Sequence, residues 1–268
     1  MKKLIVGGAV ILSAGLAGTA TAAVITWDTI SNSSTTADAC TNGVGNACTF
    51  TKGTEILTAR AYATNDNAGS GAFEKATITV YSGGIGVKNP DQVGRSYSNN
   101  ENDSPDHAID NDGRDDLVVF EFSNSLFDLD SFQIGWRDND SDIRWWIGGA
   151  SLGANFDFTG QTFSSLSGLG FNSSGGFNNV AINTTKSVSG DETGRYLIFA
   201  PSLQDTVRHS PPDSKYDYFK LSQITGTLGT VVVPPPDPDP QTTVPEPGTA
   251  ALLGIALAGL WASRRRKS

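Results

Sequence analysis

The hydrophobic pattern of the chain is mostly that of short β-strands. Phe132, Ile134 and Trp136 alternate with polar or small neighbours, and residues 143–147 repeat this alternation, which is typical of strands with one buried face. The apolar runs are rich in β-branched and aromatic residues and end at Gly, Asn, Asp or Pro. The strands predicted in this way are 76–81, 117–122, 131–136, 143–147, 155–158, 195–199 and 218–224.

The pattern predicts an all-β body over residues 23–230. A helical period is arguable only at residues 56–63. Gly, Ser and Asn make up half of residues 148–189, but phenylalanines recur through this segment, so we expect short strands and tight turns packed on a core. A body of this size can bury a sizeable core. We therefore predict a β-sandwich, jelly-roll-like in architecture.

The first 22 residues have a different pattern. Lys2 and Lys3 precede an uncharged apolar run, and the small-residue site Ala20-Thr21-Ala22 follows. This order of a cationic, an apolar and a small-residue region is typical of a secretory signal peptide. We predict cleavage after Ala22, which exports the rest of the chain.

The C-terminal region has three parts. Residues 231–243 are rich in proline and predict an extended stalk. Residues 248–262 carry no charge. A helix formed by them would be apolar on every face, whereas a core helix of a soluble domain is amphipathic. Trp261 and a cluster of cations end this run, so we predict a transmembrane helix over 248–262 and a cytoplasmic basic tail over 263–268.

Residues 244–268 as a set resemble a known sorting signal. Val244, Pro245, Glu246 and Pro247, the apolar segment and the basic tail resemble the C-terminal signal of PEP-CTERM proteins, which are substrates of exosortase-type transpeptidases. The resemblance implies a sorting enzyme as partner. It also implies an intermediate anchored in the inner membrane, followed by the cell surface or the extracellular space. Residues 83–87, 104–116 and 138–142 and the pair Gly135-Trp136 together resemble an exosortase-dependent surface protein family. This resemblance covers residues 76–147 and implies no catalytic residues.

The cysteine count predicts a disulfide, and the net charge limits the classes of partner. Cys40 and Cys48 are the two cysteines of the chain, and in an exported protein such a pair predicts a disulfide. Six of the nineteen lysines and arginines lie in the predicted signals, which leaves thirteen against 28 acids, a net charge of −15 for the body. An acidic body argues against nucleic acid as a partner.

Two acidic knots could bind calcium through oxygen ligands at alternate positions. Asp110 and Asp112 of the first knot precede the predicted strand 117–122, and Asp138, Asp140 and Asp142 of the second lie between the predicted strands 131–136 and 143–147. Neither knot has the spacing of an EF-hand loop. The alternative, which we favour, is that these residues form Asx-turns between strands and need no metal.

The candidate catalytic motif is weak. Residues 149–153 match G-x-S-x-G, and Asp191 or Asp205 and then His209 follow in the order of a hydrolase triad. A nucleophile elbow needs a strand, a sharp turn and a helix, and no helix is predicted after Ser151. Two histidines without free cysteines cannot form a structural zinc site. We therefore predict that the body is not an enzyme.

The tryptophans offer a candidate carbohydrate site. In the alternation above, Trp136 and Trp145 face the core, whereas Trp146 lies beside Arg144 on the outward face, where an aromatic ring can stack on a sugar. The sequence as a whole predicts an exported surface or extracellular-matrix protein with a structural or adhesive role. We predict that the body needs no cofactor, although calcium and a cell-surface polysaccharide are candidate ligands. The alternative is a carbohydrate-binding or carbohydrate-active enzyme domain.

Overall fold

The computed structural model describes residues 23–31, 37–66, 70–90, 104–123, 126–189, 193–202 and 216–229. The predicted signal peptide, stalk, transmembrane helix and sorting motif lie outside these residues. Among the residues that are described, no helix is both long and apolar enough to cross a membrane.

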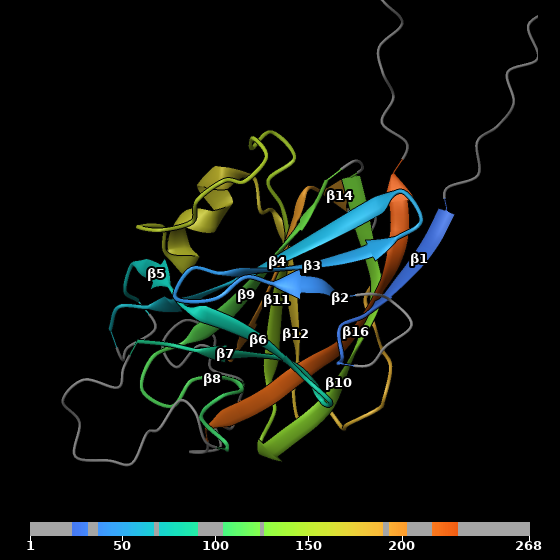
Figure 1. Ribbon diagram of the computed structural model, residues 1–268. Helices are drawn as coiled ribbons and strands as arrows, with labels where there is room; N and C mark the ends of the chain where they lie inside the picture. The colour runs from blue at the N-terminus through green and yellow to red at the C-terminus, as the bar shows by residue number, and fades with distance from the viewer. Residues whose placement is uncertain are drawn as a thin grey trace, which may run out of the picture. The chain divides into compact units, whose positions relative to one another are not determined.

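Two antiparallel sheets form the body (Figure 1). The first, sheet A, has the order β13-β10-β16-β7-β6, with β1 and β8 also paired to β16 and β14 paired to β10. β16 is its central strand, because β10 pairs along one edge while β1, β7 and β8 share the other. The strands of sheet A are β1 (Ala23–Asp28), β6 (Thr77–Tyr81), β7 (Gly84–Lys88), β8 (Ile109–Asp110), β10 (Leu126–Asn139), β13 (Lys186–Ser187), β14 (Thr193–Gly194) and β16 (Asp217–Gly229).

The second sheet, sheet B, has the order β12-β11-β15-β9-β4-β3-β2, with β5 paired to β4. Its central strands β9 and β15 are buried along their whole length. The strands of sheet B are β2 (Ala37–Cys40), β3 (Ala47–Lys52), β4 (Glu55–Thr64), β5 (Phe73–Lys75), β9 (Asp116–Phe122), β11 (Ile143–Gly148), β12 (Ser173–Phe177) and β15 (Tyr196–Pro201).

The main core lies between the two sheets. Trp27 of β1 packs on Phe122 of β9, with ring centroids 5.5 Å apart. Phe132 of β10 packs on Phe199 of β15 at 5.0 Å. Because each contact joins one sheet to the other, the all-β prediction with two packed sheets is confirmed, whereas the jelly-roll likeness stays a prediction.

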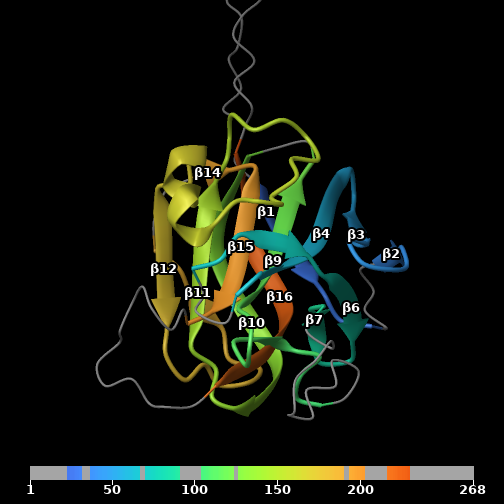
Figure 2. The same cartoon turned by 90° about the vertical axis from the view of Figure 1, so that its left-hand side faces the viewer.

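A second core covers the outer face of sheet B. The 3-10 helix η1 (Phe163–Leu169) and the loops around it bring Phe158, Phe163 and Phe171 onto Tyr62 and Trp146. Figure 2 shows η1 beside the upper ends of β11 and β12. The Gly-, Ser- and Asn-rich segment is therefore packed on the body, as the recurring phenylalanines predicted.

The strand predicted at 155–158 does not form. The backbone N–H groups of Phe156 and Phe158 donate to the hydroxyls of Tyr196 and Tyr62, at 3.1 and 3.4 Å, and not to a neighbouring strand. Residues 56–63, the arguable helix, lie instead in β4. Every second residue of β4 from Leu57 is buried, and the small side chains Ala59, Ala61 and Ala63 allow close packing in the main core.

The strict alternation predicted for residues 132–136 fails at Trp136. The register of β10 against β16 shifts between Ile134 and Trp136, and such a bulge redirects the side chain that follows. The ring of Trp136 is only partly buried, and its centroid lies 4.3 Å from the Nζ atom of Lys220. Burial lowers the pKa of Lys220 to about 8. The prediction that Trp136 faces the core is therefore wrong, whereas that for Trp145 is correct.

The predicted disulfide between Cys40 and Cys48 is present and joins β2 to β3. Opening this loop with a reductant is expected to lower the free energy of unfolding by about 2 kcal/mol, because the unfolded chain regains loop entropy. Urea unfolding of the oxidised and reduced protein measures the difference. A variant with both cysteines replaced by alanine is the control and should not respond to the reductant. Equal unfolding midpoints for the oxidised and reduced protein would contradict this expectation.

Candidate functional site

Three carboxylates gather where β16 begins. Asp140, Asp142 and Asp217 each offer one oxygen, and these atoms all lie within 4.8 Å of one another. Asp140 and Asp217 are buried, at 1% and 3% exposed, whereas Asp142 is half-buried. We call Asp140, Asp142 and Asp217 the carboxylate cluster.

Hydrogen bonds hold the carboxylate cluster in place. The backbone N–H of Asp142 donates to Oδ1 of Asp217 at 2.6 Å. The side chain of Asn111 donates to Oδ2 of Asp217 at 3.2 Å and accepts from the backbone N–H of Asp217 at 2.8 Å. Asn111 also donates to the carbonyl of Ser202 at 2.9 Å. The two acidic knots of the sequence therefore meet at Asp217.

The electrostatics of the cluster favour a bound proton or cation. Burial, together with the negative charges of Asp142 and Asp140, raises the pKa of Asp217 to about 8. The hydrogen bond from the backbone of Asp142 opposes this shift. Carboxylates at this spacing suit Ca²⁺, which completes its shell of 6–8 oxygens with carbonyls and waters. Asp140, Asp142 and Asp217 are thus the residues that could hold a calcium ion.

The five aspartates proposed from the sequence do not form one site. Asp140 and Asp142 enter the cluster. The backbone N–H of Asp112 donates to Oδ1 of Asp110 at 3.0 Å, which is an Asx-turn, and Oδ2 of Asp112 accepts from the Tyr218 hydroxyl at 2.8 Å. Asp138 is exposed on β10. The turn alternative therefore describes the first knot.

Sequence reasoning missed Asp217, which comes 75 residues after Asp142. Its one signal was its position directly before the predicted strand at 218–224, since Asp116 and Asp142 hold comparable positions before other strands. The sequence does not show which strand ends meet in space. That adjacency comes from the pairing of Asp217 with Asn139 and of Asp140 with Asp217.

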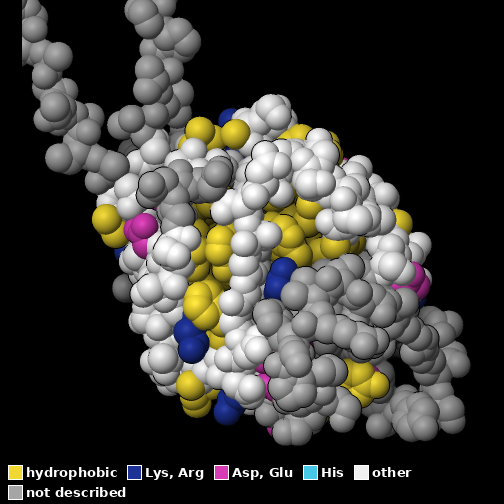
Figure 3. Space-filling model, turned by 180° about the vertical axis from the view of Figure 1, so that it is seen from behind, with side chains coloured by type: hydrophobic (Ala, Val, Ile, Leu, Met, Phe, Trp, Pro, Cys, Tyr) yellow, Lys and Arg dark blue, Asp and Glu magenta, His cyan; other side chains and the backbone are white. Residues whose placement is uncertain are grey.

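Part of the acidic excess of the body is internal. Among the described residues, six acidic side chains are buried: Asp110, Asp115, Asp116, Glu121, Asp140 and Asp217. On the face shown in Figure 3, acidic side chains are few and scattered, and apolar side chains show between polar and backbone atoms. Among the described atoms of that face, the acidic side chains therefore form no continuous patch.

Trp146 is not open to a sugar ring. It does lie on the outer face of sheet B, as predicted, but only 8% of its surface is exposed. Its ring stacks on Phe163 of η1 with centroids 5.2 Å apart, and the Arg144 guanidinium lies 6.0 Å from its centroid. The candidate carbohydrate site at Trp146 is therefore corrected to a packing contact beneath η1.

The G-x-S-x-G match at 149–153 has no nucleophile elbow. Ser151 is exposed in the turn after β11, and the next helix begins at Phe163. An elbow needs a helix directly after the nucleophile. The triad candidates Asp191, Asp205 and His209 lie outside the described residues.

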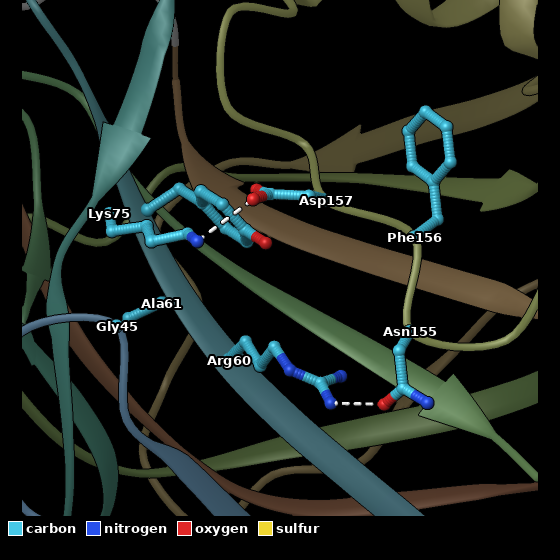
Figure 4. Close-up of a pocket in the computed structure, with 8 residues that line it drawn as sticks. Gly45, Arg60, Ala61, Lys75, Asn155, Phe156 and Asp157 are labelled. Atoms are coloured by element: carbon cyan, nitrogen blue, oxygen red, sulfur yellow. Dashed lines mark hydrogen bonds and ion pairs between the residues drawn. The ribbon is translucent and has the colours of Figure 1, made fainter.

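A small polar pocket opens beside β4 and β5 (Figure 4). It has a volume of about 100 Å³, below the ~300 Å³ of ordinary small-molecule sites. Its lining residues are Gly45, Arg60, Ala61, Tyr62, Lys75, Asn155, Phe156 and Asp157. No sequence motif pointed to it, because its residues come from segments far apart in the chain.

The fold and the cluster define a disulfide-bonded, two-sheet β-domain with a buried carboxylate cluster. The tail adds a destination, because residues 243–267 match the protein family described as the PEP-CTERM protein-sorting motif. This match confirms the predicted C-terminal motif and implies an exported surface protein that depends on an exosortase. No curated protein and no solved structure matches the chain.

Proposed function

We propose that the body is a structural or adhesive domain of the cell surface or extracellular matrix, without catalysis of its own. The observation that supports this proposal is the carboxylate cluster. Asp142 precedes β11 of sheet B, whereas Asp217 begins β16 of sheet A. The hydrogen bond between Asp142 and Asp217 joins the ends of the two sheets. These aspartates therefore stabilise the packing of the body.

Calcium is part of this proposal as a stabilising ligand of Asp140, Asp142 and Asp217. A cation there would neutralise the repulsion that raises the pKa of Asp217 and would link loops of both sheets. Ions bound in this way stabilise the folded state by mass action. This role needs no open coordination position and no substrate.

The ends of the chain carry the sorting part of the proposal. A signal peptide at residues 1–22 exports the body, and a helix at 248–262 holds it in the inner membrane. An exosortase-type enzyme then recognises Val244, Pro245, Glu246 and Pro247. The proline-rich stalk at 231–243 keeps this site accessible.

Incubating the protein recovered from its native cell surface with polysaccharides tests the role of the body. We expect no new reducing ends, because the described part of the chain offers no assembled catalytic site. Retention on a polysaccharide without turnover would support the adhesive role. Release of sugar products would instead favour the competing class, a carbohydrate-active enzyme, and overturn the proposal.

A further inference from the structure

The pocket beside β4 and β5 is assembled from several distant segments. Figure 4 shows the Lys75 ammonium pointing toward Asp157, and Arg60 of β4 pointing toward Asn155. Nζ of Lys75 lies 2.8 Å from Oδ2 of Asp157. Nη2 of Arg60 donates to Oδ1 of Asn155 at 2.6 Å. Gly45 comes from the loop between the two cysteines.

A buried carboxylate fixes one side of the pocket. Glu121 of β9 is 6% exposed. Its Oε2 accepts from Nη1 of Arg60 at 3.0 Å, and its Oε1 accepts from the backbone N–H of Asn155 at 2.8 Å. Tyr196 holds the same loop by donating to the carbonyl of Gly153 at 2.6 Å. Arg60 and Asn155 are therefore preorganised by partners from the centre of sheet B.

The disulfide loop fixes the opposite side. The backbone N–H of Gly45 donates to the carbonyl of Ala76 at 2.8 Å, and the side chain of Asn46 makes hydrogen bonds of 2.8 and 2.9 Å to the backbone of Ile78. Gly45 has a φ of +77°, and a Cβ atom there would lie 2.9 Å from Cδ of Lys75. The positive φ favours glycine at this position, and the absence of a Cβ leaves room for the Lys75 side chain.

The side chains of the pocket have more hydrogen-bond donors than acceptors available to a ligand. Asp157 accepts from Lys75 and, through Oδ1, from the backbone and hydroxyl of Thr159 at 3.0 and 2.7 Å. Within the described residues, Oδ1 of Asn155 is used by Arg60. A guanidinium has five N–H donors and an ammonium has three, so Arg60, Lys75 and the Asn155 amide all retain N–H groups. Arg60 is paired with Glu121 and Lys75 with Asp157, so the excess at the pocket is in N–H donors and not in net charge.

From this excess of fixed donors we propose that the pocket binds a single carboxylate, of the kind that uronic acids present in acidic polysaccharides. Charge-assisted hydrogen bonds from Arg60 and Lys75 would hold the two oxygens. Ala61 and the partly buried ring of Phe156 provide apolar surface beside the sugar ring. This inference deepens the adhesive half of the proposed function, since it names the chemistry of the partner.

The rest of the body favours an isolated carboxylate over a densely charged polyanion. The net charge of −15 repels a chain of phosphates, whereas a pocket of about 100 Å³ admits one group. Lys75 and Asp157 are about half exposed, with side-chain exposures of 48% and 52%. The ion pair is therefore open to a ligand that competes with Asp157 for Lys75.

Calorimetric titration of the mature protein with trigalacturonate tests the inference, with its methyl ester as the uncharged match. We expect trigalacturonate to bind and the ester to bind at least about tenfold more weakly, since the charge-assisted bonds are lost. Equal binding of both would overturn the inference. Tighter binding of inorganic phosphate or of triglutamate would also overturn it, because it would assign the pocket to a phosphate or an acidic peptide.

Two substitutions separate a binding role from a structural one. Lys75→Gln is expected to weaken trigalacturonate binding about tenfold, whereas Asp157→Asn is expected to strengthen it about threefold by removing the internal competitor. Lys186→Gln, on β13 of sheet A, removes the same charge elsewhere and should leave binding unchanged. Weaker binding in Asp157→Asn, or an equal loss in Lys75→Gln and Lys186→Gln, would contradict the site.

These outcomes are distinguishable from failure of the proposed function. Loss of the uronate site leaves a structural body without this ligand, and the assay for new reducing ends still decides whether the body is an enzyme. Conversely, release of sugar products would overturn the structural and adhesive role. The effects of Lys75→Gln and Asp157→Asn would still decide whether the pocket binds a carboxylate.

Discussion

Replacing Pro245 and Glu246 together by alanine is expected to stop C-terminal processing and to leave the protein in the inner membrane with its C-terminal tail intact. Proline fixes φ near −65° and removes a backbone donor, and Glu246 between Pro245 and Pro247 adds one negative charge. Alanines at positions 245 and 246 remove the backbone restriction of Pro245 and the carboxylate of Glu246. These residues lie within the matched sorting motif. Intact mass and cell fractionation of the variant measure the result.

The matched control for this variant is the replacement of Pro238 and Asp239 by alanine. These residues have the same types of side chain but precede the matched motif at 243–267. We expect normal processing and surface display in the control. A processed, surface-exposed product from the Pro245 and Glu246 variant would contradict recognition of this motif.

The second large effect concerns pH and calcium. The pKa of Asp217 is about 8 in the folded protein, compared with an ordinary value of 3.8. Between these values the folded state binds more protons than the unfolded state, so stability is lost as the pH rises from about 4 to about 8. At about 1.4 kcal/mol per pKa unit, the loss is on the order of 6 kcal/mol at most. Calcium is expected to restore stability at pH 8 and to have less effect at pH 5, where the proton competes.

Melting temperatures in EDTA and in millimolar calcium, at pH 5 and pH 8, measure both effects. Asp142→Asn should reduce the pH dependence and the calcium response, because it removes one of the charges that raise the pKa of Asp217. Asp138→Asn is the matched control, since Asp138 is exposed and not part of the cluster. Equal melting temperatures at pH 8 with and without calcium would exclude the metal. A melting temperature in EDTA that does not fall from pH 5 to pH 8 would contradict the raised pKa.

Much of the fold follows from local pattern. The predicted strand at 117–122 is found as β9 and that at 143–147 as β11, because β-branched and aromatic side chains there alternate or are buried on both faces. The pattern gave a wrong prediction at 155–158, where the backbone N–H of Phe158 donates to the hydroxyl of Tyr62 and not to a neighbouring strand. It also failed at the register shift before Trp136, since a bulge is set by pairing with another strand.

The site was less predictable than the fold. The acidic knots were visible, but their meeting at Asp217 depends on which strand ends lie side by side. The pocket has no motif at all, because Gly45, Arg60, Lys75 and Asn155 are joined only by the order of sheet B. The exposure predicted for Trp146 was wrong for a related reason, since η1 begins seventeen residues after it in sequence and folds back over it.

The pairing of β1 with β16 has a mechanical consequence. Ala23 lies opposite Leu228, so the first and last described residues of the body share one pole (Figure 1). β16 runs about 40 Å from there to Asp217 at ~3.3 Å per residue. A pull on the chain after Gly229 would act along β16, whose ladder to β10 extends over nearly its whole length. Under a load applied between Gly229 and the opposite pole of the body, those hydrogen bonds would bear the force together in shear, whereas peeling would break them one by one.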